Sequence, residues 1–204
     1  MSHEQELSSL SYTECLGFGD LEAMLALQDS LPEECYQFLK IREREDLEAH
    51  LSAGMPIIGV WDDDHLVAYA LLTYPDLKEH AKFLEGYPED PNAAILQSVV
   101  STQKGGLTLL LNKAKELTTE KGLESLYAKV NAANENGLHA FGKRGFETVQ
   151  VGTDPVKGYS AHFMQAVISP ETQLSEGLSQ PAQDLPGYQF LKEEHPQESV
   201  QAQL

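Results

Sequence analysis

A strand-like segment that passes through two adjacent glycines directly into an amphipathic helix most constrains the fold of this chain. The segment AAILQSVVS, over 93–101, is apolar on both faces, which is typical of a central strand in a sheet. Leucines then recur with helical spacing from Leu107, and Gly122 follows the pattern as a helix terminator. A buried strand that leads into such a helix predicts an α/β fold.

Further elements are predicted on both sides of this unit. Alternating apolar residues predict strands over 57–61, 66–73, 125–130, 146–151 and 159–168, with a hairpin turn at 62–64. A 3.6-residue period predicts helices over 18–31, 32–54 and 134–145, the first capped by Asp20 and the second interrupted near its middle. The charged, proline-containing stretch 75–92 is expected to be mainly loop.

The chain length fits one core and a tail. Residues 1–168 carry all of the predicted elements and form one expected domain. Residues 169–204 are acidic, rich in Ser, Gln and Pro, and show no sustained period, so we expect a mobile or surface-draped tail.

The chain is strongly acidic, with 14 Lys and Arg against 32 Asp and Glu and a formal charge of −18. Such a charge repels polyphosphate backbones and anionic lipids, so nucleic acid and membrane surfaces are not expected partners. The same field attracts cationic amines weakly, although acidity also serves simply to keep a protein dispersed.

The two cysteines, Cys15 and Cys35, lie in segments expected to be helical or nearly so, and they form no CxxC pair. Neither a disulfide framework nor a structural metal site is expected. The polar N-terminus does not read as a secretion signal, and no window is apolar enough to span a membrane. The cytoplasm is therefore the expected location.

The glycine corner, residues 103–108 with the sequence QKGGLT, has the chemistry of an anion site. Backbone N–H groups at a helix start are unpaired and the helix dipole favours an anion there. Gly105 and Gly106 would let a phosphate approach the backbone, and Lys104 adds a positive charge. A tight strand-to-helix turn is the alternative explanation. Neither GxxxxGK[ST] nor GxGxxG is present, which argues against a Walker loop and a dinucleotide fingerprint.

The glycine corner resembles the pyrophosphate loop of the GNAT superfamily of acetyl-CoA-dependent N-acetyltransferases, Q/R-x-x-G-x-G/A. Gln103 and Gly106 match, and Thr108 stands where Gly or Ala is usual. Downstream, VNAANENGLHAFGKRGFE resembles the family pattern N-x-x-A-I-x-L-Y-x-x-x-G-F. In it, the positions that match are Asn134, Leu138, Gly145 and Phe146, and the positions that depart are Gly137, Ala140 and Phe141.

The resemblance implies a three-layer α/β (α+β) fold. Its central mixed, mostly antiparallel sheet would splay at the fourth strand and carry helices on both faces. Acetyl-CoA would be the cosubstrate, without a metal. Its pantetheine arm would lie along Val99, Val100 and Ser101, with Asn134 and Phe141 facing it. The diphosphate would contact Gln103, Lys104, Gly105, Gly106, Leu107 and Thr108. Asn134 would in addition cap the helix that follows it.

Phe141 stands where the family usually has a tyrosine that protonates the leaving thiolate. Tyr127 is the preferred substitute, ahead of His139 and Tyr159, because a strand residue can point into the cleft. Glu89 and Asp90, just before the central strand, are candidates for the base that deprotonates the amine.

The expected function is transfer of an acetyl group from acetyl-CoA to a primary amine of a small molecule or peptide. Glu33 and Glu34 are candidates for binding a cationic acceptor. Because Phe141 and Thr108 depart from the family pattern, the alternative is an acyl-CoA-binding sensor with little transfer. A protein-interaction module is a third hypothesis. The resemblance is also compatible with a homodimer.

Overall fold

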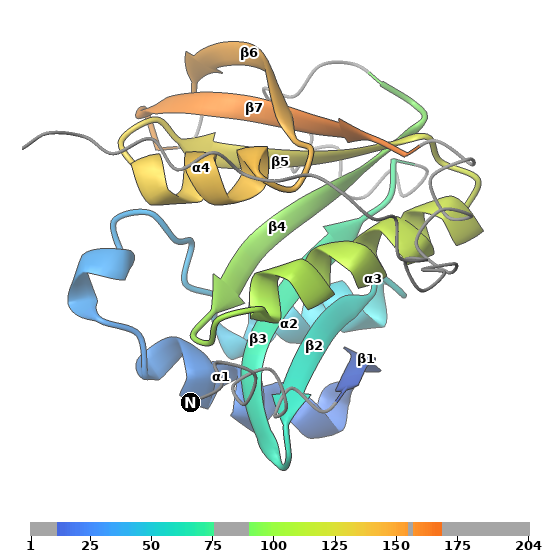
Figure 1. Ribbon diagram of the computed structural model, residues 1–204. Coiled ribbons are helices and arrows are strands. Elements are labelled where there is room, and N and C mark those ends of the chain that lie inside the picture. Colours follow the sequence, from blue (N-terminus) through green and yellow to red (C-terminus); the bar gives the residue numbers. More distant parts are fainter. Residues whose placement is uncertain (1–11, 76–89, 155–156, 169–204) are drawn as a thin grey trace, which may run out of the picture. The chain divides into compact units, whose positions relative to one another are not determined.

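The computed structural model describes residues 12–75, 90–154 and 157–168, which build one mixed sheet with helices on both faces (Figure 1). The strands are β1 (Tyr12–Leu16), β2 (Ile57–Asp62), β3 (His65–Thr73), β4 (Ala93–Ser101), β5 (Ser125–Asn131), β6 (Glu147–Thr153) and β7 (Ser160–Val167). The helices are α1 (Leu21–Asp29), α2 (Arg44–Ser52), α3 (Gly106–Glu120) and α4 (Glu135–Gly142), with short 3-10 turns η1 (Phe18–Asp20) and η2 (Glu33–Cys35).

The sheet has seven strands in the order β1-β2-β3-β4-β5-β7-β6, and only β4 and β5 run parallel. This parallel pair is joined by α3, because two parallel neighbours need a crossover connection. β4 and β5 pair only from Ala93 opposite Ser125 to Leu96 opposite Ala128. Beyond these pairs β4 turns away from β5, so the predicted splay at the fourth strand is confirmed (Figure 1).

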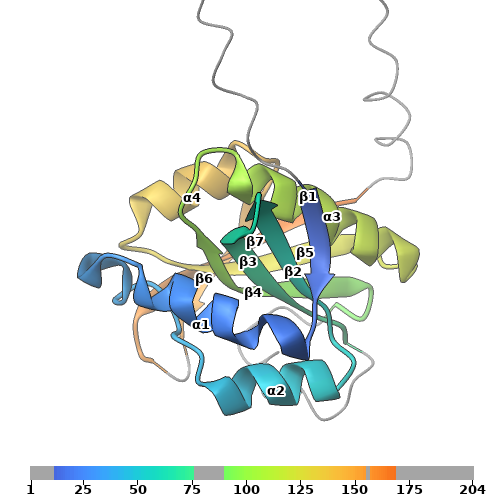
Figure 2. The same cartoon turned by 90° about the horizontal axis from the view of Figure 1, so that it is seen from below.

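The helices form a layer on each face of the sheet. Figure 2 shows α3 and α4 on one side and α1 and α2 on the other. Leu110 and Leu111 of α3 share one core with Phe141 of α4. Met24 of α1 and Leu47 of α2 belong to the core on the opposite face. The helical period and the strand alternation thus bury both apolar faces of the sheet.

The predicted strands are observed. The helical region predicted over 32–54 is present only as η2 and α2, because residues 36–43 between them form a loop. Further corrections concern the N-terminal part of the chain. β1 is absent from the sequence prediction, because this edge strand is short and mostly exposed and carries no apolar alternation. Cys15 lies in β1 rather than in a helix. Asp20 occupies the N-cap position of α1, but its carboxylate accepts from the Gly17 N–H at 2.7 Å.

Some expectations fall outside the described residues, namely those for the 169–204 tail and for most of the 75–92 loop. Within the part of the chain that is described, no helix combines the length and apolar character needed to span a membrane.

Candidate active site

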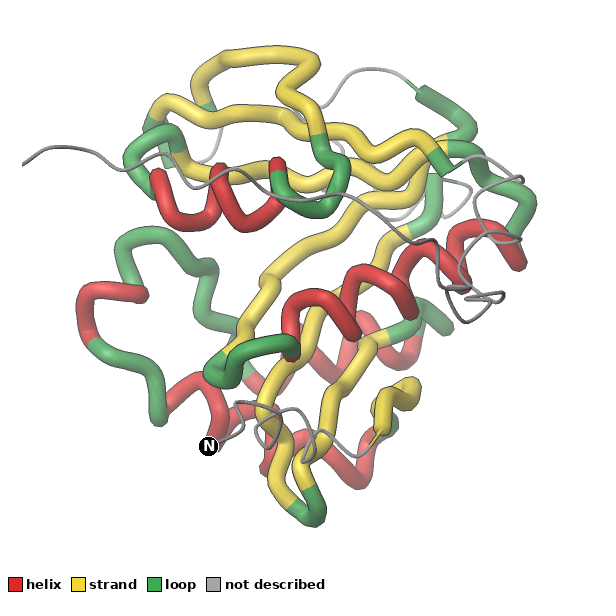
Figure 3. The backbone as a smooth tube through the Cα atoms, in the orientation of Figure 1, coloured by secondary structure: helices red, strands yellow, loops and turns green. Residues whose placement is uncertain are grey.

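A cavity of about 250 Å³ lies where β4 and β5 separate. Its walls come from 96–99 of β4, 128–131 of β5, both ends of α4 and two loops. One loop, 36–43, connects η2 to α2, and the other contributes Asp154, Lys157 and Tyr159 between β6 and β7 (Figure 3). Segments from across the chain therefore meet at the split in the sheet.

A bulge in β4 marks the start of the split. Tyr69 and Leu71 of β3 pair with Val100 and Gln97, so β4 has one extra residue between these pairs. Ser98 in this bulge has a φ of 47°, in the left-handed region. Bulges redirect a strand and end its pairing, and this one releases the edge of β4 from β5. The backbone edge that faces the cavity can then bind an extended ligand arm.

The glycine corner lies at the end of β4 and presents unpaired donors. Gly105, with a φ of 93°, is the N-cap of α3, and no side chain caps this helix. Among the described residues, the N–H groups of Gly105, Leu107 and Thr108 have no acceptor. These donors and the start of a 15-residue helix fit a diphosphate.

Gly106 is required for packing. A Cβ added there would lie 2.7 Å from Ser101 Oγ and 3.2 Å from Ala68 Cβ. The missing side chain lets α3 begin directly against β3 and β4. The tight-turn explanation and the anion-site explanation therefore apply together, because close packing of the helix start also fixes the direction of its donors.

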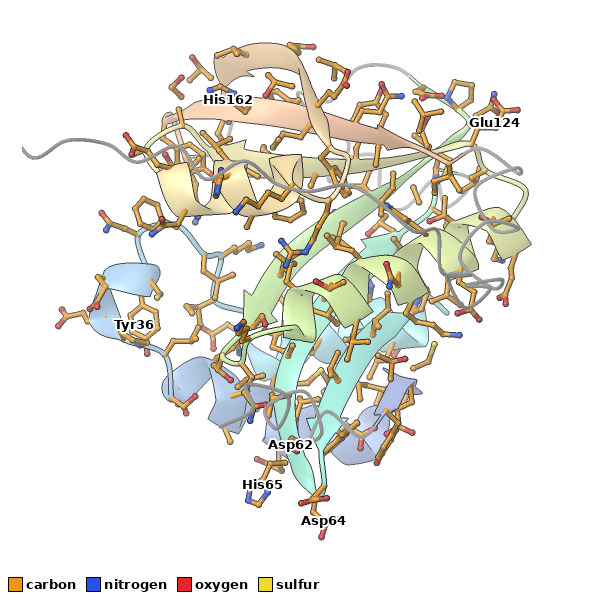
Figure 4. The ribbon with its side chains drawn as sticks, in the orientation of Figure 1. Tyr36, Asp62, Asp64, His65, Glu124 and His162 are labelled. Atoms are coloured by element: carbon orange, nitrogen blue, oxygen red, sulfur yellow. The ribbon has the colours of Figure 1, made fainter. Side chains whose placement is uncertain are left out.

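Gln103 holds the glycine corner rather than extending from it. Its Nε2 donates to Asp62 Oδ2 at 3.0 Å, which ties the corner to the end of β2. Figure 4 shows Asp62 near the tip of the β2–β3 hairpin, with Asp64 and His65 beyond it. Lys104 is exposed beside the corner.

Thr108, the departure from the family pattern, anchors a cation that the sequence analysis did not single out. The Arg144 Nε donates to Thr108 Oγ1 at 3.0 Å, and its Nη1 donates to the Ala140 carbonyl at 2.6 Å. The hydroxyl of Thr108 thus holds a guanidinium next to the unpaired donors of α3.

Asn134 and Phe141 both line the cavity. Asn134 Oδ1 accepts from the Gly137 N–H at 2.8 Å, so this residue caps α4 as expected. A Cβ at residue 137 would lie 2.6 Å from Asn134 Nδ2, which explains the glycine there. Phe141 is buried edge-to-face against Phe146, with ring centroids 5.1 Å apart. Its ring carries no ionisable proton.

The residues expected to contact the pantetheine arm lie at different depths. Val99 lines the cavity, whereas Val100 packs into the core and Ser101 is exposed.

Arg42 forms a buried part of the cavity wall. Its Nε donates to Ser98 Oγ at 2.7 Å and its Nη2 donates to Gln97 Oε1 at 2.9 Å, so the guanidinium braces the bulge in β4. The Gln28 side chain bonds both the N–H and the carbonyl of Arg42, at 2.8 and 3.1 Å. Burial lowers the pKa of the Arg42 guanidinium, although Asp46 acts in the opposite direction.

A buried carboxylate completes this wall. Asp154 accepts from Lys129 Nζ at 2.6 Å and from the Lys157 N–H at 2.6 Å. Tyr159 donates to the same carboxylate. Burial, followed by the charge of Asp154 and this hydrogen bond, raises the pKa of the Tyr159 hydroxyl. Arg42, Lys129, Lys157, Asp154 and Tyr159 are called the cationic wall below.

Tyr127 and Asp90 lie together but outside the cavity lining. The Tyr127 hydroxyl is bonded to Asp90, and burial, followed by the Asp90 charge, raises its pKa. Tyr127 pairs with Ile95 before the two strands separate. The geometry therefore gives this pair no contact with the cavity. Glu89 lies outside the described residues.

Glu33 and Glu34 are exposed on η2 and do not line the cavity. Figure 4 shows the neighbouring Tyr36 on the outer part of this segment. The wall nearest to them, at 38–42, carries cations instead. Binding of a cationic acceptor by Glu33 and Glu34 stays a prediction, and neither residue contacts the cavity.

No family model matches the chain, and no curated protein matches it either. Several solved structures match it in fold. A GNAT-family acetyltransferase from Streptococcus pneumoniae is 16% identical, with a TM-score of 0.58 over 78% of this chain and 99% of that one. A ribosomal-protein-alanine N-acetyltransferase from Brucella melitensis is 19% identical, with a TM-score of 0.55 over 77% and 99%. A protein from Salmonella typhimurium, assigned as an acetyltransferase and solved with its cofactor acetyl-CoA, is 13% identical, with a TM-score of 0.55 over 78% and 94%. The chain has the GNAT fold of the N-acetyltransferases.

Proposed function

We propose that the protein transfers an acetyl group from acetyl-CoA to a primary amine. The observation that carries this proposal is the split between β4 and β5. A cavity lies at the split, and the N-terminus of α3, which no side chain caps, follows the end of β4. The acetyl-CoA in a structure of the same fold supports the cosubstrate. Val99 and the freed edge of β4 would bind the pantetheine arm, and the glycine corner with Arg144 would bind the diphosphate.

The reaction needs an oxyanion site and two proton transfers. The amine nitrogen attacks the thioester carbon, the carbon–sulfur bond breaks, and the proton lost by the amine is balanced by one gained by the thiolate. Backbone N–H groups at the β4 bulge would stabilise the negative oxygen.

Tyr159 is the proton donor that we favour over Tyr127, because Tyr159 lines the cavity and Tyr127 does not. Like an ordinary tyrosine, whose pKa is about 10, Tyr159 is protonated at neutral pH, and its raised pKa makes the hydroxyl a weaker acid. In the structure the hydroxyl donates its one proton to Asp154, so it would turn from Asp154 to the leaving sulfur to protonate the thiolate.

Phe141 favours a second candidate, an acyl-CoA-binding protein with little transfer, since the usual donor position has no hydroxyl. Release of free thiol separates the two. The purified chain would be incubated with acetyl-CoA and a panel of primary amines, and thiol would be measured against a reaction without amine. Amine-dependent release supports the enzyme. Binding of acetyl-CoA without such release supports the second candidate.

A further inference from the structure

The bulge in β4 is held by a side chain from a distant part of the chain. Arg42 precedes α2, yet its Nε donates to Ser98 Oγ at 2.7 Å and its Nη2 donates to Gln97 Oε1 at 2.9 Å. Two donors of one guanidinium thus bond the side chains of two consecutive residues at the bulge. Because the guanidinium presents its N–H groups in a rigid plane, these bonds fix both side chains relative to each other.

Arg42 is itself held in place by a buried residue of α1. Gln28, which is 2% exposed, accepts from the Arg42 N–H at 2.8 Å and donates to the Arg42 carbonyl at 3.1 Å. On the other side, Gln97 Nε2 donates to Thr73 Oγ1 of β3 at 3.5 Å. The bulge is therefore connected through side chains to both α1 and β3.

Ser98 has a backbone conformation that needs support. Its φ of 47° lies in the left-handed region, which is unfavourable for residues with a Cβ. Among the described residues, the other non-glycine residue with a positive φ is Asp63, in the turn between β2 and β3. Strain inside a strand persists where surrounding contacts enforce it, and it concentrates at functional sites. The bond from Arg42 to Ser98 Oγ supplies such a contact.

The residues of the bulge line the cavity. Gln97, Ser98 and Val99 belong to its lining, and the N–H groups of this bulge are the donors that we assign to the negative oxygen. Such donors act only when they are aimed at the developing charge, and a displacement of about 1 Å can cost about 100-fold in rate. The loop that carries the guanidinium also contributes Phe38 and Leu39 to the cavity. One set of hydrogen bonds therefore joins the cavity wall to the oxyanion donors.

We propose that Arg42 is a positioning residue, which holds the β4 bulge in the conformation that aims its backbone N–H groups at the thioester oxygen of acetyl-CoA. This inference rests on the proposed acetyl transfer and adds a residue that acts at a distance from the reacting atoms. Arg42 acts through Ser98 and Gln97, whose side chains it bonds. When the amine attacks, the N–H groups already point at the oxygen on which the charge develops.

Infrared spectroscopy of bound acetyl-CoA tests this inference without requiring turnover. The cosubstrate would be isotopically labelled at the acetyl carbonyl carbon and bound to the full chain and to the variants Arg42→Lys and Ser98→Ala. Lysine keeps the charge but lacks the planar fork, and alanine removes the acceptor of Arg42 Nε. A hydrogen bond to the carbonyl oxygen lowers the frequency of the C=O stretch. The band should therefore move to higher frequency in both variants.

Arg44→Lys is the matched control. Arg44 begins α2, and its guanidinium pairs with Glu22 and Glu48 at the surface rather than with β4. This variant should keep the wild-type band. An unchanged band in Ser98→Ala and Arg42→Lys would overturn the inference, as would an equal shift in the control. If Arg42→Lys does not fold, Ser98→Ala decides alone, because it leaves the buried arginine in place.

Steady-state kinetics separate positioning from a purely structural role. Arg42→Lys and Ser98→Ala should each lower kcat by about tenfold or more, with little change in the affinity for acetyl-CoA, because the contacts to its diphosphate remain. The double variant should lose no more than the weaker single variant, since both changes remove the same bond. An unchanged kcat per folded molecule would overturn the inference.

The two proposals fail in different ways. If the wild type binds acetyl-CoA without amine-dependent thiol release, the proposed function fails, and the infrared comparison still decides the role of Arg42. If thiol is released but the carbonyl band is the same in all proteins, the role of Arg42 fails and the function stands. Absence of acetyl-CoA binding by the wild type would overturn both.

Discussion

The glycine corner and the cationic wall are two parts of the candidate site, and they are built in opposite ways. The corner is six consecutive residues, and its donors come from a backbone that Gly105 and Gly106 allow. The wall is assembled from side chains at 42, 129, 154, 157 and 159, which are brought together only by the complete sheet. A local backbone site tolerates drift elsewhere in the chain, whereas a wall of paired side chains depends on each partner. The same fold can therefore keep one cosubstrate and change its acceptor.

The largest expected loss of stability comes from a change in the cationic wall. Lys129→Met removes the ammonium that is paired with the Asp154 carboxylate, a side chain that is 3% exposed. We expect the free energy of unfolding to fall by about 3–5 kcal/mol, since breaking a buried ion pair strands a charge. Urea denaturation measures this loss. The double variant Lys129→Met with Asp154→Leu should recover part of it, and a double variant as unstable as the sum of both single changes would contradict the pairing.

Tyr159→Phe tests the catalytic part of the wall. Loss of a general acid should lower kcat by about 100-fold, with little change in acetyl-CoA affinity. In the wild type, the raised pKa of Tyr159 means that the hydroxyl keeps its proton above about pH 10, where an ordinary tyrosine loses it. The stability that Tyr159 contributes to the folded protein is complete below about pH 10 and is lost as the pH rises through the pKa of the folded state. Steady-state kinetics of Tyr127→Phe provide the control, and an equal loss there would contradict the choice of Tyr159.

Gly106→Ala tests whether the corner depends on packing. The new Cβ would meet Ser101 Oγ at 2.7 Å, and overpacking should cost about 1–3 kcal/mol. Adding Ser101→Gly removes the closest of these contacts, so thermal and urea unfolding should recover toward the wild type. If Gly106→Ala alone is as stable as the wild type, the close approach of α3 to β4 is not what selects glycine.

The smallest effect is expected beside Arg42. The Tyr69 hydroxyl is fully buried and has no hydrogen-bond partner among the described residues. Burial raises its pKa, while Arg42 lowers it, which places the two groups near each other. Tyr69→Phe removes an unsatisfied group, so the protein should be unchanged or more stable by up to about 1 kcal/mol. A clear loss of stability would mean that the hydroxyl is bonded.

The contrast between corner and wall also explains what the sequence could predict. The strand, the glycines and the helix are local patterns, so the corner, the splayed sheet and the role of Asn134 as a cap were predictable from residues close together in the chain. Tyr127 illustrates the limit. Alternation correctly placed it on a strand, but whether it lay before or after the split depended on the pairing of β4 with β5.

Arg42 and Asp154 carried no local signal at all. Each is a charged residue in a polar stretch, and such residues are ordinarily exposed. Their burial follows from tertiary contacts with Gln28, Ser98 and Lys129, which are distant in sequence. Net charge is equally uninformative about the site, because −18 describes the whole chain and not the cavity.

Calorimetric titration of acetyl-CoA into the full chain and into Thr108→Asp tests the central claim most directly. An aspartate in the first turn of α3 favours the helix dipole, so folding should be preserved, but its charge would repel a diphosphate at the same donors. Gln150→Glu adds the same charge at an exposed position on β6 and serves as the control. Binding by the wild type and the control, weakened at least tenfold in Thr108→Asp, is the predicted result. Absence of binding by the wild type, or equal binding by all three proteins, would contradict the account.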